Sequence, residues 1–154
     1  MKIRLLMFGK NKDSYTEQMV KDFEKKIRPF CELDLQYLKD EKVHDDVEKI
    51  LKKESERLFN KLENRDYLII LDDKGQSLSS ITFSQKFQNI IDSGPSSIVF
   101  VIGSAHGLSM EVKERADLLL SLSTLTMTHQ IVRLVLLEQI YRAFTILRGM
   151  KYHK

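Results

Sequence analysis

Short apolar runs alternate with helix-like segments along the chain, and this order limits the folds that the chain can adopt. Strands that alternate with helices form mainly parallel sheets with helices on their faces. At 154 residues the chain has the usual length of one domain. We therefore predict a single α/β domain over residues 1–154. The strand-like runs are residues 2–8, 32–38, 67–71, 97–102 and 117–122.

The last two runs each lead into a loop rich in glycine or hydroxyl side chains. The run 97–102, the most hydrophobic of the chain and therefore expected at the centre of the sheet, precedes Gly103 and Gly107. Five Ser or Thr residues lie within residues 121–128. Ligands of open parallel sheets bind at the carboxyl ends of the strands, so these loops and Leu71 are expected to form one site. Its apolar residues suit a flat adenine ring, whereas the alternative is an ordinary strand and helix start.

The last predicted helix, residues 129–148, is followed by Gly149, which is typical of a helix end. Residues 131–137 place apolar side chains around nearly the whole helix axis. Such a helix is buried in a core or against another subunit. Because a domain of this size has little room for a fully enclosed helix, the stretch predicts a dimer interface.

The net charge of +3 arises entirely in the C-terminal segment. Residues 129–154 carry a net charge of +4, and the rest of the chain carries −1. A local basic excess attracts phosphate backbones, although a solvated helix face gives the same pattern. Arg133 interrupts the apolar stretch and needs a carboxylate or a ligand anion. Glu138 and Arg142, four residues apart, are expected to pair.

Several classes of site lack support in the sequence. The single cysteine, Cys31, excludes an internal disulfide and a cysteine-based zinc site, and it fits a reducing cytoplasm. We expect it to be a small buried side chain. No apolar run approaches the roughly 18 residues of a membrane span, and residues 1–10 are typical of a strand rather than a signal peptide. The glycine motifs of dinucleotide sites and P-loops are absent.

The C-terminal third also carries four ordered motifs. They are Ile-Gly-x-x-x-Gly-Leu from Ile102, Leu-Ser-x-Leu-Thr-x-x-His-Gln-x-x-Arg from Leu122, Glu-Gln-x-Tyr-Arg-Ala from Glu138, and Leu-Arg-Gly-x-x-Tyr-His-Lys from Leu147. With these motifs in this order, the chain resembles the family of ribosomal RNA large subunit methyltransferase H, small members of the SPOUT methyltransferases. The resemblance extends over the full length.

The resemblance implies a function and a partner. Members transfer a methyl group from S-adenosylmethionine to N3 of a pseudouridine in 23S rRNA, in a stem-loop that faces the decoding region. The implied fold is a SPOUT-type sheet with a C-terminal trefoil knot, and the implied assembly is a cytoplasmic homodimer that acts on the ribosome, not on DNA or a membrane. The implied cofactor contacts are Leu71, Gly103, Leu122, Ser123, Thr124, Leu125, Thr126 and Met127.

The chemistry requires that N3 of pseudouridine lose its proton. A histidine of near-neutral pKa is a suitable acceptor, and His129 and His153 are the candidates. Tyr152 offers a stacking face or a proton relay, and arginines can hold phosphate or stabilise developing charge. Water as the proton acceptor remains an alternative. The catalytic candidates are His129, Arg133, Arg142, Tyr152 and His153, and no metal ion is predicted.

Two residues depart from the family pattern. Ser104 stands where a second glycine is usual, and Thr128 stands where proline often precedes the motif histidine. Ser104 is expected to need a less unusual backbone angle, and Thr128 to cap the last helix with its side chain. The tail, residues 151–154, is expected to lie over a cofactor pocket of its own subunit or of its partner. The alternative for the tail is a frayed terminus.

Two other functions compete with this interpretation. An RNA-binding module could retain the fold without binding S-adenosylmethionine. A SPOUT enzyme could also methylate another atom, such as a ribose 2′-oxygen. Cofactor binding separates the first alternative, and analysis of the methylated product separates the second.

Overall fold

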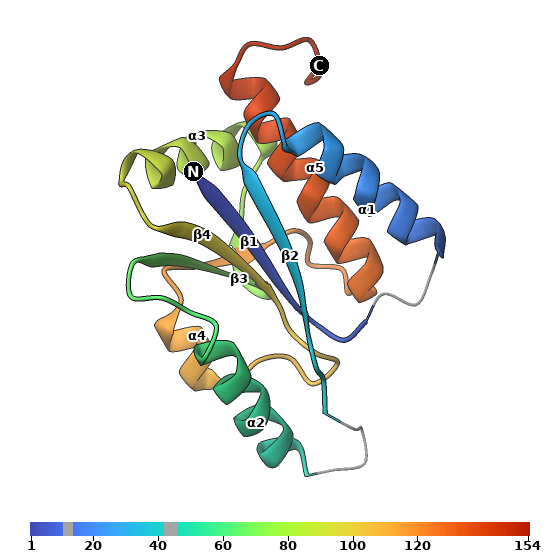
Figure 1. Cartoon of the computed structure of the whole chain (residues 1–154), viewed down its shortest axis with the longest axis vertical. Helices are drawn as coiled ribbons and strands as arrows, with labels where there is room; N and C mark the ends of the chain where they lie inside the picture. Colours follow the sequence, from blue (N-terminus) through green and yellow to red (C-terminus); the bar gives the residue numbers. More distant parts are fainter. Residues whose placement is uncertain (11–13, 42–45) are drawn as a thin grey trace.

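A five-stranded parallel sheet forms the centre of the protein (Figure 1). It is seen in a computed structural model that describes residues 1–10, 14–41 and 46–154. The strand order is β2-β1-β4-β3-β5. The strands are β1 (Lys2–Phe8), β2 (Glu32–Leu38), β3 (Asp66–Ser77), β4 (Ser97–Ile102) and β5 (Leu118–Ser121). The helices are α1 (Ser14–Ile27), α2 (Val47–Phe59), α3 (Ser80–Asp92), α4 (Met110–Arg115) and α5 (His129–Leu147).

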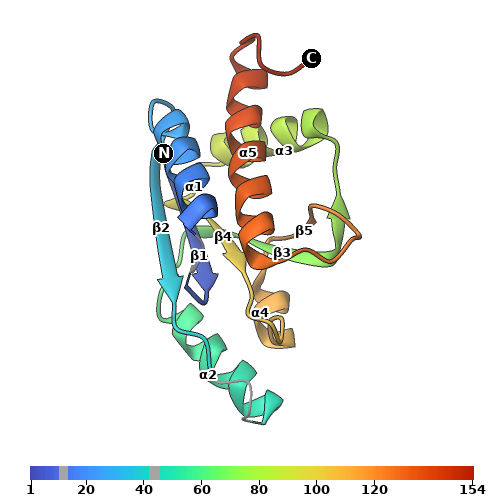
Figure 2. The same cartoon turned by 90° about the vertical axis from the view of Figure 1, so that its right-hand side faces the viewer.

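Strand β4 lies at the centre of the sheet, as its sequence predicted. All six of its residues are buried. Phe100 belongs to the core on the face covered by α1, α3 and α5, and Val99 and Val101 belong to the core under α2 and α4. Figure 2 shows these two groups of helices on either side of the sheet. The prediction of an α/β fold with a mainly parallel sheet is therefore confirmed.

Helix α5 packs between α1 and α3, but one chain does not enclose it (Figures 1 and 2). Leu136, Leu137 and Ile140 are fully buried against the sheet. Ile131, at the beginning of the same apolar stretch, is 47% exposed. The sheet, α1 and α3 therefore cover only part of the apolar surface of α5.

Strand β3 is longer than its sequence predicted. The strand-like run in the sequence ends at Leu71, whereas β3 continues to Ser77 through a bulge. Leu71 and Gln76 both pair with Leu120 of β5, so residues 72–75 bow out between two segments of one ladder. A Cβ atom on Gly75 would lie 2.7 Å from the backbone carbon of Leu119. Residues 72–75 thus interrupt the ladder, but Gly75 lets the strand resume beside β5.

The expectation that the single cysteine is buried is confirmed. Cys31 is buried, and burial raises the pKa of its thiol to about 11. Over the described ranges, no helix is long and apolar enough to cross a membrane.

The close approach at Gly75 predicts a stability effect. In a Gly75→Ala variant the added methyl group would force β3 and β5 apart, and overpacking of this kind lowers the free energy of unfolding by about 1–3 kcal/mol. Chemical denaturation measures this loss. Gln76→Ala, an exposed change in the same strand, should stay within about 0.5 kcal/mol of the parent protein. Equal effects of the two substitutions would contradict the proposed close contact.

Candidate functional site

A cavity of about 370 Å³ lies between the bulge of β3 and the loops that follow β4 and β5. Because β3 is the neighbour of both β4 and β5 in the sheet, the bulge and the two loops meet at one edge. Leu120, Leu122 and Val132 give the cavity an apolar side, and Asp72 and Asp73 bring carboxylates to it. Of the residues expected to contact a cofactor, the lining contains Leu71, Gly103, Leu122, Ser123, Leu125, Thr126 and Met127.

Thr124 is the one expected cofactor residue that does not line this cavity. Its side chain is exposed. The turn around it is fixed by Ser123, whose hydroxyl accepts a hydrogen bond from the amide of Leu125 at 3.0 Å. The carbonyl of Ser123 in turn accepts a hydrogen bond from the hydroxyl of Ser121. The hydroxyl groups of this segment therefore shape the loop as well as face the cavity.

The loop after β4 closes on itself around Gly103. A Cβ atom there would lie 2.9 Å from the side chain of Leu108 and 3.0 Å from the carbonyl oxygen of Gly107. Gly107 has a φ angle of +78°, and its amide donates to the carbonyl of Ser104. Ser104 does not adopt a positive φ angle, as predicted, and its hydroxyl accepts from the amide of His106. Gly103 is thus required by the packing of the loop itself.

Sequence reasoning missed the charged rim of the cavity. Lys113 of α4 lies 2.7 Å from a carboxylate oxygen of Asp72, and both residues line the cavity with Asp73. The hydrogen bond from Lys113 is the main cause that holds the pKa of Asp72 below its usual value. The two acidic residues that follow the strand-like run 67–71 could have indicated this rim.

His129 lies between this cavity and a second one of about 590 Å³. The second cavity is lined by residues at the ends of β1 and β2 and at the beginning of α5. Burial is the main cause that lowers the pKa of His129, the charge of Arg133 lowers it further, and Asp40 opposes them. The ring of His129 is therefore neutral at pH 7 and able to accept a proton.

Thr128 occupies the N-cap position of α5 but does not cap the helix with its side chain. This corrects the expectation from the sequence. The backbone of Thr128 has the extended conformation of a cap residue, and its carbonyl accepts from the amide of Val132. The first amides of α5 therefore keep their hydrogen-bonding capacity beside the two cavities.

Arg133 lines the second cavity and is 2% exposed. Its guanidinium carbon lies 4.8 Å from the ring centre of Tyr37. Sequence reasoning required a carboxylate or a ligand anion for this charge. Among the described residues, no Asp or Glu forms an ion pair with it, and its Nε and Nη1 atoms have no hydrogen-bond partner.

The other three catalytic candidates cluster at the far end of α5. Arg142 pairs with Glu138, as predicted, and also lies 3.2 Å from Nδ1 of His153. The hydroxyl of Tyr152 donates to Glu138 at 3.1 Å, and burial is the main cause that raises the pKa of Tyr152. Because a helix rises about 1.5 Å per residue, this cluster lies roughly 20 Å along α5 from His129. One chain therefore separates the predicted catalytic residues into two groups.

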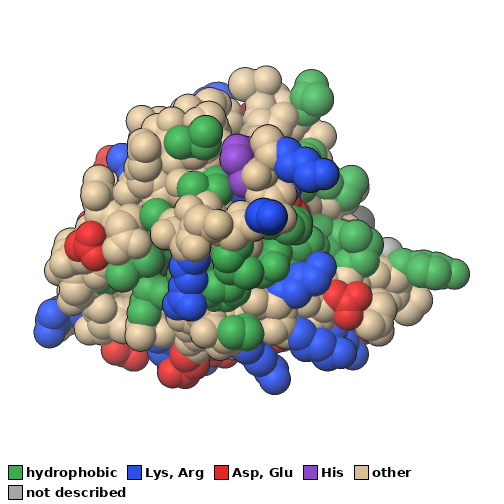
Figure 3. Space-filling model, turned by 90° about the horizontal axis from the view of Figure 1, so that it is seen from above, with side chains coloured by type: hydrophobic (Ala, Val, Ile, Leu, Met, Phe, Trp, Pro, Cys, Tyr) green, Lys and Arg blue, Asp and Glu red, His purple; other side chains and the backbone are tan. Residues whose placement is uncertain are grey.

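The tail is packed rather than frayed. The ring of Tyr152 lies edge-on to Tyr141 at 4.8 Å and faces the guanidinium of Arg142. Figure 3 looks onto the end of the molecule where the chain terminates and shows apolar side chains flanked by Lys and Arg, with a His among them. Such a surface combines stacking faces with positive charge.

Comparison with known proteins identifies the family. Residues 1–153 match the family model described as "Predicted SPOUT methyltransferase". The chain belongs to the SPOUT methyltransferases. It is similar along the full length of both chains to proteins named ribosomal RNA large subunit methyltransferase H, with 43% identity in Streptococcus suis and 40% in Halothermothrix orenii. The family expected from the motifs is therefore confirmed.

A solved structure supports the SPOUT fold. A probable methylase family protein from Haemophilus influenzae Rd KW20 superposes with a TM-score of 0.56 at 8% identity. The superposition covers 96% of this chain and 66% of that protein. The SPOUT trefoil knot itself stays a prediction.

Within residues 1–10, 14–41 and 46–154 we find no metal-binding cluster, that is, no group of three or more His, Cys, Asp or Glu side chains placed to hold a metal ion.

The surroundings of His129 predict its titration. By NMR, its imidazole pKa should lie below the ordinary value of 6.5. The pKa should rise in Arg133→Met, which removes a lowering charge, and fall further in Asp40→Asn, which removes the opposing carboxylate. Each substitution removes one charged group from the lining of the same cavity, and the two charges have opposite signs, so each variant is the control for the other. Shifts of the same sign in the two variants would contradict this electrostatic arrangement.

Proposed function

We propose that the protein transfers a methyl group from S-adenosylmethionine to N3 of a pseudouridine in 23S rRNA, in the large subunit or the assembled ribosome. The observation that carries the proposal is the cavity at the ends of β3, β4 and β5, in a chain that matches the methyltransferase H relatives over its whole length. The name of these relatives supports ribosomal RNA as the substrate. The assignment of pseudouridine N3 as the methylated atom rests on the resemblance of the sequence motifs to those of the family.

The cavity has the chemical features that the cofactor needs. Its volume of about 370 Å³ falls within the usual range for small-molecule sites, and its apolar side suits an adenine ring. Asp73 lines the rim and can attract the cofactor's positive charge. S-adenosylmethionine supplies a methyl group already activated by a sulfonium. The protein's task is then to align the acceptor nitrogen with that methyl group and to accept a proton.

The proton of N3 has two histidine acceptors in the proposed site. His129 borders the cofactor cavity and is neutral at pH 7. His153 contacts Arg142 in the tail cluster, where Tyr152 provides an aromatic face for the base. As N3 gains the methyl group, its proton passes to one of these rings or to water. Arg142 would stabilise the charge that develops on the uracil oxygens.

A homodimer would bring the two groups of residues together. Helix α5 keeps the tail roughly 20 Å from the cofactor cavity of its own chain. The apolar side chains of α5 that the chain leaves half-buried or exposed provide a surface for a second copy. We propose that α5 forms this interface and that each tail reaches the cavity of the partner subunit. The exposed Ile131 and the half-buried Val135 would then be covered.

Methyl transfer to ribosomes tests the proposed reaction. Labelled S-adenosylmethionine and ribosomes that lack the modification should give 3-methylpseudouridine, identified by mass spectrometry of the nucleosides. A 2′-O-methylated product would assign the enzyme another target atom. RNA binding without cofactor binding or transfer would indicate a non-catalytic module.

The matched variants for this test are Thr126→Trp and Thr124→Trp. Both residues are exposed, but only Thr126 lines the cavity. At about a hundred times its dissociation constant, the cofactor should stabilise the parent protein by about 2.7 kcal/mol, or roughly 5–11 °C in Tm. Thr126→Trp should lose this shift and the transfer, whereas Thr124→Trp should retain both. Normal binding by Thr126→Trp would place the cofactor elsewhere.

Mixed dimers test whether the tail acts on the partner subunit. Deletion of residues 151–154 should preserve cofactor binding, cost about 1 kcal/mol of stability from the contacts of Tyr152, and abolish transfer. Thr126→Trp keeps its tail but loses its cavity. When the two inactive proteins are mixed, about a quarter of the activity should return, since half of the dimers gain one complete site.

Two controls decide between the possible arrangements. Light scattering on the unmodified protein should give twice the mass of the 18.0 kDa chain. No recovery in a mixture that is shown to exchange subunits would mean that each tail serves its own cavity. A mass of one chain at micromolar concentration would rule out the dimer.

A further inference from the structure

The second cavity carries features that transfer of a methyl group does not explain. It adjoins the cofactor cavity and shares Ser104, Ala105 and His129 with it. Ligands in the two cavities would therefore border the same three residues. The cavity is lined by Phe8, Gly9, Lys10, Tyr37, Leu38, Lys39, Asp40, Ser104, Ala105, His129, Gln130 and Arg133.

Arg133 is the first feature that points to a ligand. It is 2% exposed, and two of its three guanidinium nitrogens lack a hydrogen-bond partner among the described residues. Burial without a counter-ion disfavours its charge and lowers its pKa. Tyr37 partly offsets this loss through its aromatic face and its hydroxyl, but Nε and Nη1 of Arg133 still have no hydrogen-bond partner among the described residues. An anion in this cavity would supply the missing acceptors.

The beginning of α5 is the second feature. Gln130 and His129 line the cavity, and Thr128 does not use its side chain to cap the first turn. The first amides of a helix have no partner within the helix, and the helix dipole gives them a partial positive charge. A helix of 19 residues with an uncapped first turn is therefore a suitable anion site.

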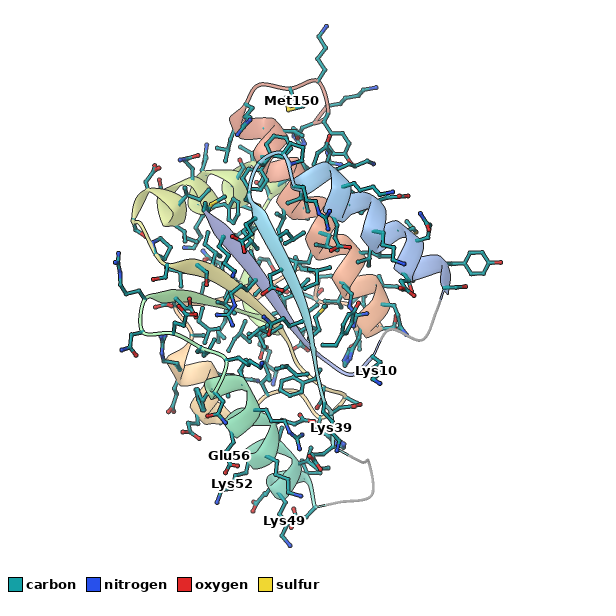
Figure 4. All side chains as sticks on the ribbon, viewed as in Figure 1. Lys10, Lys39, Lys49, Lys52, Glu56 and Met150 are labelled. Atoms are coloured by element: carbon teal, nitrogen blue, oxygen red, sulfur yellow. The ribbon has the colours of Figure 1, made fainter. Side chains whose placement is uncertain are left out.

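The charges around the cavity agree with this arrangement. Lys10 and Lys39 line it with Arg133, whereas Asp40 is the one acidic residue among its described lining. Figure 4 shows Lys10 and Lys39 in separate loops at the end of the sheet where α5 begins. With His129 neutral, the lining carries a net charge of about +2. A phosphodiester would find both general attraction and specific donors here.

We propose that this cavity binds a backbone phosphate of the RNA substrate beside the nucleotide to be methylated. The proposal rests on the proposed function, because the cavity adjoins the site at which the target base would react. Arg133 and the first amides of α5 hold the phosphate, and Lys10 and Lys39 attract the strand. The cofactor's own carboxylate is the other source of an anion, and a second copy of this chain is another occupant.

The decisive variant is Arg133→Met, which removes the charge but keeps an unbranched apolar side chain. Its Tm should equal or exceed that of the parent protein, since an unpaired buried charge disappears. Its KM for ribosomes should rise at least tenfold, and the slope of log KM against log salt should shrink by about 1, while cofactor binding stays unchanged. Arg65→Met, an exposed change at the opposite end of the strands, is the matched control and should leave KM unchanged. Arg133→Lys should restore part of the affinity.

The outcomes separate this proposal from the proposed function. If the parent protein methylates ribosomes but Arg133→Met shows the parent KM and salt dependence, the phosphate site is wrong and the enzyme assignment stands. A lower Tm with an unchanged KM would make Arg133 purely structural. If the parent protein transfers no methyl group, the enzyme assignment fails, and direct binding then decides the site.

Direct binding uses the Arg133 Nε resonance in NMR spectra. A short single-stranded RNA and inorganic phosphate should both shift it, and S-adenosylmethionine should not. A shift with S-adenosylmethionine but not with methylthioadenosine, which lacks the carboxylate, would assign the cavity to the cofactor. A shift on deletion of residues 151–154, with no response to RNA, would assign it to the tail of a second copy. Either result overturns the proposal.

Discussion

The pairing of β5 with two segments of β3 is the contact on which the proposed cofactor cavity depends. Because Leu71 and Gln76 both pair with Leu120, residues 72–75 must bow out of the sheet at the point where β5 ends. Gly75 permits this, since its backbone approaches Leu119 more closely than any side chain would allow. The bowed segment brings Asp72 and Asp73 beside the loops that follow β4 and β5. The acidic residues at the rim of the cavity are thus placed there by one irregularity in a strand ladder.

Helix α5 imposes the second constraint, which is one of distance. Its first residue lies at the proposed cofactor cavity, and Arg142, near its other end, contacts the tail. A continuous helix cannot shorten, so a complete site needs either a different path of the tail or a second subunit. A two-fold interface along α5 would place each tail on the other chain and would cover Ile131. This is why we favour the dimer over rearrangement of a tail that is already packed on Tyr141.

The sequence predicted the elements whose causes are local. Asp46, Ser79 and Ser109 each cap a helix through a side-chain hydrogen bond, a role for which Asp and Ser are favoured residue types. The apolar run of β4 placed that strand at the centre because only a strand buried on both faces is apolar throughout. The motifs around Gly103 and Leu122 identified most of the cavity lining. These signals lie within a few residues of the structure that they determine.

Features that depend on distant segments were missed or predicted wrongly. The hydroxyl of Thr128 has the right type for a cap, but the structure leaves it without a bond to the first turn. The pair of Lys113 with Asp72 joins α4 to the bowed segment of β3, and no spacing in the sequence encodes it. The same holds for Tyr37, which meets Arg133 from β2. The distance between Arg142 and His129 follows from helix geometry. It was missed because both residues belong to the C-terminal motifs and were therefore assigned to one site.

Arg133 shows how stability and binding oppose each other in this protein. A buried guanidinium with two unsatisfied nitrogens destabilises the fold, and an apolar side chain of similar length would fit the same surroundings at lower cost. Deviations of this kind from otherwise consistent packing are expected where a ligand completes the site. The beginning of α5 is a second such departure, because the side chain of Thr128 does not cap the first amides of the helix. Arg133 has two nitrogens without an acceptor among the described residues, and Thr128 does not cap the first amides of α5 with its side chain, so an anion from outside the chain would satisfy both sets of donors.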